Sequence, residues 1–454
     1  MKKIVTITFL TIILFSLNTS AQTSSLYQFY KLYQNEGMLG GGAGVTWIDG
    51  KPYYSVHLFP EFVFSNFGFG LDLNMEFSSD GKLRNENFND FSDYLSIIRY
   101  VRYGYKGDPF YARLGALDYA TLGHGTIMYM YNNSPSYDNR KTGLALDIDF
   151  TTFGIETVYG SFGEKGVMGL RGFTRPLQFT DARDIPILSN FEIGASIITD
   201  LNDNTGVVNG TYDSDTDDFE VTEDKGEVTV VGIDFGLPII RMSKFNLELY
   251  ADYNKILRFG SGFATGFIAD FNGLGIVDLR TKFERRINGK QYLPSYFNSL
   301  YEIERFQLDK STGEVDSKIQ RLDEDLPSSN GWYGELTVSV LGTVNVLGSY
   351  QRLDKDPDSG ILHLETNVLP EDFPYVLRGG YDKINIEDEG DIFTLDDRSY
   401  LFAEFGYKPV PYLIVSLMYN WTFTPVRDND DNIIDYEPQK KIEPRISFLY
   451  PVTF

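Results

Sequence analysis

Apolar and polar residues alternate with a period of two along most of the chain, which is the pattern of half-buried β-strands. Segment 67–77, FGFGLDLNMEF, is apolar at every odd position, with Asp72 and Glu76 among the residues between. The same alternation recurs over 245–253 and 412–423. Each of these strands is therefore expected to present one face to an apolar medium and the other to a polar one.

Two features separate these strands from those of a soluble β-sandwich. The alternating segments run about 10 to 13 residues, the length that crosses a membrane at the tilt of a barrel strand. Connections alternate in length: a tight turn at Ser65 and Asn66 precedes a loop of roughly 15 residues after Phe77, and this segregation is typical of transmembrane barrels. In 412–423 we expect Phe423 to share the lipid-facing side.

The pattern predicts an all-β protein, a single antiparallel transmembrane β-barrel of about 20 strands, with 16 or 18 as alternatives. An even number places both chain ends on the periplasmic side. Connection 174–190 is too long for a periplasmic turn, so it either folds into the lumen or marks an error in the count. Strands are expected to begin near residues 37, 51, 66, 93, 109, 140, 152, 165, 190, 227, 244, 258, 274, 331, 342, 359, 374, 397, 411 and 440.

The N-terminus has the features of a secretory signal peptide over residues 1–21. Lys2 and Lys3 precede an apolar run that is too short for a spanning helix, and small residues end at Ala21. Residues 22–36 form a leader or a short helix, and the barrel domain covers 37–454. We expect export with signal cleavage and residence in the cell outer membrane.

Composition narrows the class of partner. The formal net charge is −24, which disfavours nucleic acid as a partner. Cysteine is absent, so neither a disulfide nor lipid attachment at a cysteine contributes. Aromatic residues make up 15% of the chain, as expected for a barrel with aromatic girdles at both membrane interfaces.

The loop 117–140 carries the most distinctive candidate site. Glycines at 123 and 125 bracket His124 beside a run of tyrosines and asparagines. The loop either folds inward as a constriction or stays outside as an ordered loop. Facing basic and acidic walls would orient polar solutes, and the candidate pore-lining residues are Arg99, Arg102, Arg113, Asp118, His124, Arg140, Asp147 and Asp149.

Metal binding and catalysis have weak signals. Asp213, Asp215 and Asp217 have the first spacings of a calcium loop, but Asp218 replaces its turn glycine. We expect no cofactor beyond Ca²⁺ or Mg²⁺ held weakly at acidic loops. No catalytic motif appears around the three histidines, and we expect no enzyme activity, with a membrane hydrolase at His124 as a minor alternative.

The last strand carries the most specific signal. In EPRISFLYPVTF, Lys441, Glu443, Arg445 and Ser447 are expected to face the lumen. The apolar positions on the opposite face are Ile446, Phe448, Tyr450, Val452 and Phe454. A terminal strand that ends in an aromatic residue resembles that of the outer-membrane β-barrel proteins of Gram-negative bacteria, in which it is the signal read by the barrel-assembly machinery.

This resemblance implies outer-membrane lipid, lipopolysaccharide and the barrel-assembly machinery as partners. It also implies a porin-like channel for small polar solutes, because a barrel of this size leaves space that inward side chains do not fill. A structural or interaction barrel, plugged by its own loops or part of a secretion or surface-assembly complex, is the alternative.

Overall fold

The computed structural model describes residues 36–453 except 89–90, 214, 217, 311, 324–325, 342, 369–372 and 430–431. The expected signal peptide (1–21), the leader expected before residue 36, and Phe454 lie outside the described residues. Among the described helices, none has the length and apolar character needed to cross a membrane.

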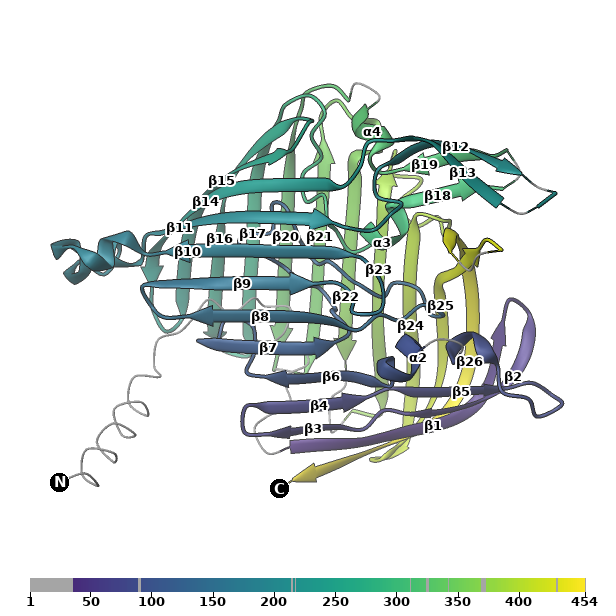
Figure 1. The fold of residues 1–454 in the computed structure, drawn as a ribbon. Coiled ribbons are helices and arrows are strands. Elements are labelled where there is room, and N and C mark those ends of the chain that lie inside the picture. Colours follow the sequence, from purple (N-terminus) through teal and green to yellow (C-terminus); the bar gives the residue numbers. More distant parts are fainter. Residues whose placement is uncertain are drawn as a thin grey trace, which may run out of the picture.

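Twenty antiparallel strands close into one barrel, as the alternation predicts (Figure 1). The barrel sheet has 22 segments because two of its strands are each broken in two. The segments of the first half are β1 (Glu36–Ile48), β2 (Lys51–Leu58), β3 (Glu61–Phe64), β4 (Phe67–Leu71), β5 (Leu73–Phe77), β6 (Ile98–Tyr103), β7 (Phe110–Gly115), β8 (Gly143–Asp149), β9 (Phe153–Tyr159), β10 (Val167–Thr174) and β11 (Glu192–Asp200). Those of the second half are β14 (Val228–Arg241), β15 (Phe245–Ile256), β16 (Ser261–Leu274), β17 (Val277–Asn288), β20 (Ser329–Val340), β21 (Val344–Leu353), β22 (Gly360–Val368), β23 (Tyr375–Ile386), β24 (Ser399–Val410), β25 (Leu413–Arg427) and β26 (Ile433–Thr453).

One break separates β2 from β3 at Phe59 and Pro60, where proline has no N–H to donate to the ladder. Both β2 and β3 pair with β1, so they form a single barrel strand. The Phe59 ring lies over Gly40 of β1, where a Cβ would come within 2.3 Å of it, so only glycine fits. The second break, between β4 and β5 at Asp72, lies beside the first break on the neighbouring strand.

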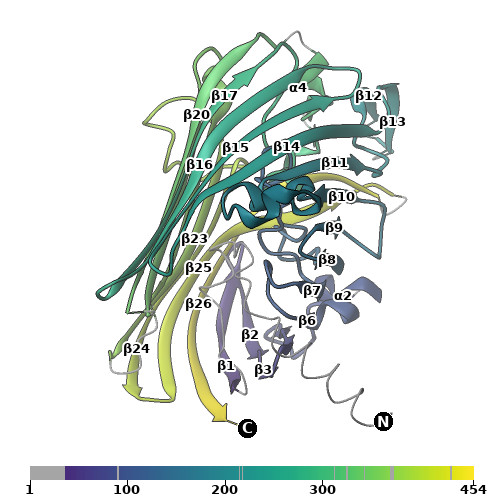
Figure 2. The same cartoon turned by 90° about the vertical axis from the view of Figure 1, so that its left-hand side faces the viewer.

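The last strand closes the barrel on the first. The register of β1 and β26 runs from Glu36 opposite Thr453 to Ile48 opposite Lys441. The ends of the described chain therefore lie at the same end of the barrel (Figure 2). This closure pairs the first and last strands of the described barrel with each other, so neither presents an open sheet edge to lipid.

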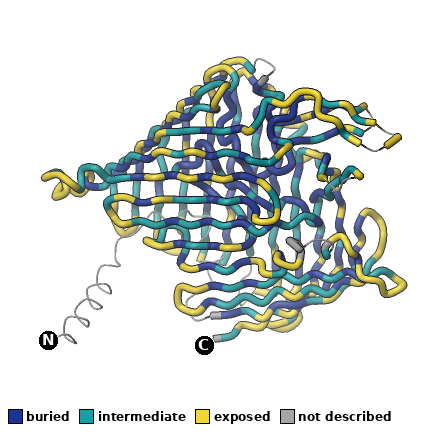
Figure 3. Tube along the Cα trace, in the orientation of Figure 1, coloured by how far each residue is buried: buried dark blue, intermediate teal, exposed yellow. Residues whose placement is uncertain are grey.

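Exposure follows the predicted alternation around the wall (Figure 3). On β26, Lys441, Glu443, Arg445 and Ser447 are buried in the interior, and the side chains between them point outward. The exposed members of the outward set are Ile446, Phe448 and Tyr450. One predicted orientation is wrong: Phe423 is fully buried, because at this height β25 packs against a loop inside the barrel.

Most strands begin within a few residues of the expected positions, with two corrections. The strand expected near residue 93 begins at Ile98, because the short helix α2 (Phe91–Ser96) precedes it. The strand expected near residue 440 begins at Ile433. Strands β6 to β9 have 6 or 7 residues, shorter than predicted.

Connections segregate by length in part. The end that holds the chain termini carries short connections except at 175–191, whereas the opposite end carries the other long loops together with short connections such as 49–50 and 257–260. Connection 175–191 forms three short turns of 3-10 helix, η3 (Pro176–Phe179), η4 (Asp181–Asp184) and η5 (Leu188–Asn190). It projects from the end of β10 and β11 with its apolar side chains exposed, so the strand count stands.

Besides α2, the connections at the opposite end of the barrel carry two hairpins and two small helices (Figure 1). A small apolar cluster, which includes Val207, Phe306 and Ile434, joins both hairpins to the start of β26. These elements are β12 (Val207–Asp213), β13 (Asp218–Asp224), β18 (Phe306–Asp309), β19 (Glu314–Ser317), α3 (Tyr301–Glu304) and α4 (Gln320–Asp323), with single 3-10 turns at η2 (Asn85–Asn87) and η6 (Pro357–Ser359).

Candidate functional site

Two long loops fold into the barrel and pack against each other and against its inner wall, apart from the hairpin β18–β19, which projects at the outer end (Figure 1). The first inner loop (116–142) joins β7 to β8, and the second inner loop (289–328) joins β17 to β20. Tyr129 N–H donates to the Phe297 carbonyl oxygen at 3.0 Å, and Met128 forms a bridge with Phe297. Their buried apolar cluster includes Leu117, Leu122, Ile127, Met128, Tyr131, Tyr292, Tyr296, Phe297, Tyr301 and Leu322, together with Val158, Ile198 and Val230 of the wall.

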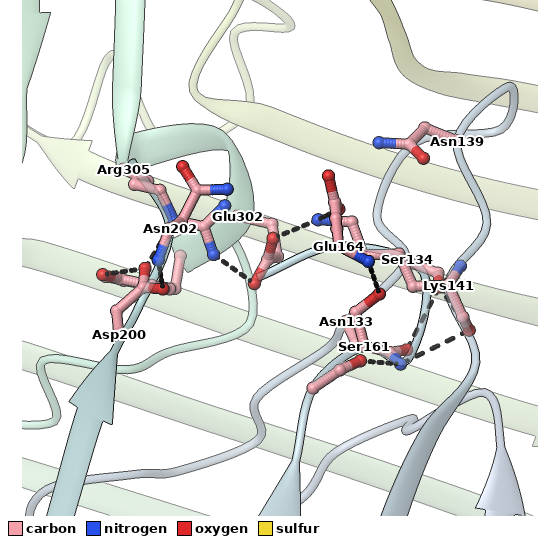
Figure 4. Close-up of polar contacts among 12 residues, drawn as sticks. Asn133, Ser134, Asn139, Lys141, Ser161, Glu164, Asp200, Asn202, Glu302 and Arg305 are labelled. Atoms are coloured by element: carbon pink, nitrogen blue, oxygen red, sulfur yellow. Dashed lines mark hydrogen bonds and ion pairs between the residues drawn. The ribbon is translucent and has the colours of Figure 1, made fainter. Parts of the chain in front are cut away.

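A chain of buried ion pairs joins the two inner loops to the wall (Figure 4). Lys141 Nζ of the first loop lies 2.5 Å from Glu302 Oε2 on α3. Arg305 Nη2 donates to Glu302 Oε1 at 2.8 Å, and its Nε donates to Asp200 Oδ2, at the end of β11, at 2.5 Å. Tyr131 donates its hydroxyl to Glu302 as well. These contacts form the ionic clamp: Lys141, Glu302, Arg305 and Asp200.

The charges of the clamp stabilise one another despite burial. Burial alone raises the pKa of the Glu302 carboxyl, but Arg305 and Lys141 outweigh it and lower that pKa to about 2. Burial likewise disfavours the charged form of Lys141, yet Glu302 and Glu164 raise the pKa of its ammonium group above the ordinary value. The clamp therefore holds fully charged partners at neutral pH.

His124 attaches the first inner loop to the wall. Its Nδ1–H donates to Asp252 Oδ1 at 2.8 Å, and Thr126 donates to the other oxygen of the same carboxylate at 2.7 Å. The imidazole stacks on Tyr250 with ring centroids 4.4 Å apart. Burial lowers the pKa of His124, but Asp252 and Glu248 outweigh it and raise that pKa well above 6.5. The imidazole is thus a cationic anchor.

A second part of the interior stays accessible to solvent. Asp118 Oδ2 lies 3.0 Å from Arg113 Nη2 and 3.7 Å from Arg99 Nη2. Asp72, also on the inner face, lies 3.7 Å from Arg140. The side chains of Arg99, Asp118 and Asp72 are 49%, 36% and 33% exposed to solvent, although each is in contact with interior partners. We call this region the accessible interior.

The structure therefore divides the predicted lining residues into groups. Arg99, Arg113 and Asp118 come together, whereas Arg102, although it lies opposite Arg113 in the sheet, stacks on Tyr105 with its guanidinium carbon 3.8 Å from the ring centroid. Asp147 lies 2.8 Å from Lys106, and Asp149 binds both Nη atoms of Arg175 at 2.9 Å. These last two carboxylates serve separate wall contacts.

A polar network spans the junction of the first and last strands. Arg445 Nη1 donates to His57 Nδ1 at 2.7 Å, and His57 Nε2–H donates to Asp72 Oδ1 at 2.7 Å. Because a carboxylate only accepts and a guanidinium only donates, these partners determine which ring nitrogen of His57 carries the proton. The network ties β26 to β2 and to the break between β4 and β5.

The calcium and hydrolase candidates find little support in the geometry. The Asp213 carboxylate accepts from the Asp215 backbone N–H in the turn after β12, and Asp217 lies outside the described residues. Among described residues, no three His, Cys, Asp or Glu side chains are placed to hold a metal. At His124, the hydroxyl that shares the Asp252 carboxylate with the imidazole belongs to Thr126, and it donates to Asp252 and not to the imidazole.

Sequence reasoning missed the residues of the clamp. Glu302 and Arg305 are three positions apart, a helical spacing, but nothing in the chain marks Lys141 or Asp200 as their partners. The same holds for Arg171, which lies within 2.7 Å of Glu156, Glu192 and Asp234, three carboxylates from three neighbouring strands. Such contacts link positions that are distant in sequence.

Comparisons with known proteins give structural likeness only. No protein-family model matches the chain, and no curated protein sequence matches it. Among solved structures, OprD of Pseudomonas aeruginosa is 9% identical with a TM-score of 0.32, and the match covers 96% of this chain and 97% of OprD. OccD3 (OpdP) of the same organism is 12% identical with a TM-score of 0.30 and 96% coverage of each chain. OccK5 (OpdH), also from this organism, is 10% identical with a TM-score of 0.31, covering 92% and 98%.

Matches at this level of identity and overlap assign neither a family nor a substrate. The chain's own geometry is sufficient for its class, because the barrel is closed, its outer face is apolar and its interior is charged. These features together make this protein a transmembrane β-barrel.

Proposed function

We propose that this protein is an outer-membrane channel for small polar solutes, narrowed by the two inner loops. The observation that carries the proposal is the accessible interior: Arg99, Asp118 and Asp72 remain partly solvent-exposed inside a closed barrel. A barrel of 20 strands encloses more space than inward side chains fill, so loops are needed to restrict it. Charged walls select polar solutes over apolar ones.

The inner loops are held by contacts that can separate. The ionic clamp and the His124 anchor are non-covalent and join segments that are far apart in sequence. Because each long loop joins two adjacent strands, it can move without breaking the wall. We therefore assign the packed arrangement to the narrow state of the channel.

Lipid, lipopolysaccharide and the barrel-assembly machinery are the proposed partners. Support for lipid comes from the exposed outward side chains of β26, Ile446, Phe448 and Tyr450. The same three residues belong to the terminal strand that resembles an assembly signal. Divalent cations held weakly at the acidic outer loops are the proposed link to lipopolysaccharide.

Single-channel recording in planar bilayers tests the channel. We expect purified protein to give discrete conductance steps, and Glu302→Gln to increase their size or their open fraction. If folded protein and folded Glu302→Gln both give no conductance, the channel is refuted and the barrel is plugged for a structural or interaction role. Folding is checked by the change in electrophoretic mobility that barrels show on heating.

A further inference from the structure

One place on the inner wall combines an unsatisfied buried nitrogen with open space. On β22 and β23, His363 lies opposite Asp382, and the next inward pair is Glu365 opposite Gly380. The following strand, β24, places Phe402 opposite Gly380. These residues all face the interior, because they share the inward phase of their strands with the buried His363 and Asp382.

The His363 imidazole is held in one orientation. Its Nδ1–H donates to Asp382 Oδ1 at 2.9 Å, and Ser299 of the second inner loop donates to the same oxygen at 2.6 Å. Tyr119 of the first inner loop meets the ring edge-on, with centroids 5.3 Å apart. The side chain is only 4% exposed, so its direction is set by the wall and by both loops.

The other ring nitrogen has an ion-pair contact but no hydrogen bond. His363 Nε2 is buried and forms no hydrogen bond, which is costly for a polar atom. Oε2 of Glu365 lies 3.9 Å away, beyond hydrogen-bond distance. That separation fits one bridging atom placed within reach of both groups.

Gly380 opens space beside this pair. A Cβ built there would meet no atom within 4 Å. The backbone of Gly380 does not have a positive φ, so its conformation does not require glycine. Other inward glycines have their space filled: a Cβ at Gly232 would lie 2.2 Å from Asn254, and one at Gly262 would lie 2.2 Å from Tyr292. The opening at Gly380 is therefore a local recess in a packed wall.

We propose that this recess binds a hydroxyl group of a neutral polyhydroxylated solute, with His363 and Glu365 as its direct partners. When Nε2 carries a proton, a hydroxyl oxygen can accept from Nε2–H while its own O–H donates to the Glu365 carboxylate, so one group bridges both partners. An ammonium group only donates and a carboxylate only accepts, so neither can do both at once.

A second contact point explains why a sugar fits better than a single alcohol. Asn367 is the next inward residue of β22, about 6.6 Å beyond Glu365 along the strand, and its Oδ1 also has no hydrogen-bond partner. Arg378, opposite Asn367, donates to Glu404 and borders the same face. A sugar ring can place separate hydroxyls at Glu365 and at Asn367. This assignment rests on the proposed channel and names its solute class.

Saturation-transfer NMR with sucrose, on full-length protein in detergent micelles, tests the site without requiring conduction. We expect a sucrose signal that falls at least fivefold in Gly380→Leu, which fills the recess, and in His363→Phe, which removes Nε2. The matched control is Gly172→Leu on the outward face of β10, where a Cβ also meets no atom within 4 Å; it should leave the signal unchanged. Tetramethylammonium, which has no hydroxyl, should give no signal.

The outcomes separate this proposal from the channel. Folded wild-type protein without a sucrose signal means that water alone occupies the recess, and it overturns the site even if conductance is present. Equal sucrose signals in wild type and Gly380→Leu also overturn it. A sucrose signal lost in Gly380→Leu but kept in Gly172→Leu supports the site even if conductance recording refutes the channel.

Discussion

Lys141 and Glu302 belong to different loops, 161 positions apart in the chain, yet Nζ of one lies 2.5 Å from Oε2 of the other. Both side chains are almost fully buried inside the barrel. The pair joins the two segments that fill the lumen, so its strength sets how firmly the inner loops stay together.

Replacing Glu302 with glutamine should loosen the inner loops. Loss of one partner from a buried ion pair costs about 3 to 5 kcal/mol, because the remaining charges stay buried without compensation. We expect faster protease cleavage within 289–328, measured by mass spectrometry of intact folded barrel. The control is Lys165→Gln, which removes the exposed pair with Asp203 and should change nothing. Unchanged cleavage in Glu302→Gln would show that the apolar cluster alone holds the loops.

Acid should release the same contact. The Glu302 pKa falls from 4.5 to about 2 in the folded protein. A lowered pKa stabilises the folded state fully above 4.5, and this stabilisation is lost as the pH falls from 4.5 through about 2. We expect loop cleavage by an acid-active protease to rise over this window in wild type and to depend less on pH in Glu302→Gln. Parallel profiles for both proteins would contradict the assignment.

Alkaline conditions should weaken the His124 anchor. Its pKa is raised well above 6.5, so the anchor is fully stabilising below 6.5 and loses that contribution as the pH rises through the raised value. NMR of histidine labelled in the ring should show His124 protonated at pH 7.5. In His124→Gln, protease cleavage within 116–142 should be faster at neutral pH. Titration of His124 near 6.5 would rule out the charged anchor.

Removing the guanidinium of Arg445 should weaken the junction of β26 with the start of the barrel. His57 Nδ1, on a partly buried side chain, would lose its donor, and the cost is at most the roughly 1 to 3 kcal/mol of a fully buried polar atom without a partner. We expect Arg445→Ala to lower the urea midpoint for loss of the folded electrophoretic form. Arg183→Ala, at an exposed position on η4, is the control and should match wild type.

Deleting Phe454 should mainly impair assembly. We expect a several-fold fall in folded barrel in the outer membrane, measured by the heat-dependent mobility shift, while Phe454→Tyr keeps wild-type levels because it keeps an aromatic ring. Normal barrel levels after the deletion would argue against the terminal strand as an assembly signal.

The sequence by itself determined the wall of this protein. Side chains of a strand alternate with a period of two, so the polarity of each residue sets its face wherever lipid lies on one side. Twenty strands, their order and the orientation of Lys441 to Ser447 followed from that rule. It failed at Phe423, where the neighbour is an inner loop and not lipid.

Only the tertiary structure decided the interior. Nothing local pairs Lys141 with Glu302 or leaves His363 Nε2 beside Gly380, because these relations arise when the barrel closes and brings distant strands and loops together. Loops carry no periodic pattern, so the sequence left open whether 117–140 turns inward. Inside the barrel, charge compensation and packing volume decide which residues meet, and both depend on positions that the chain acquires only after folding.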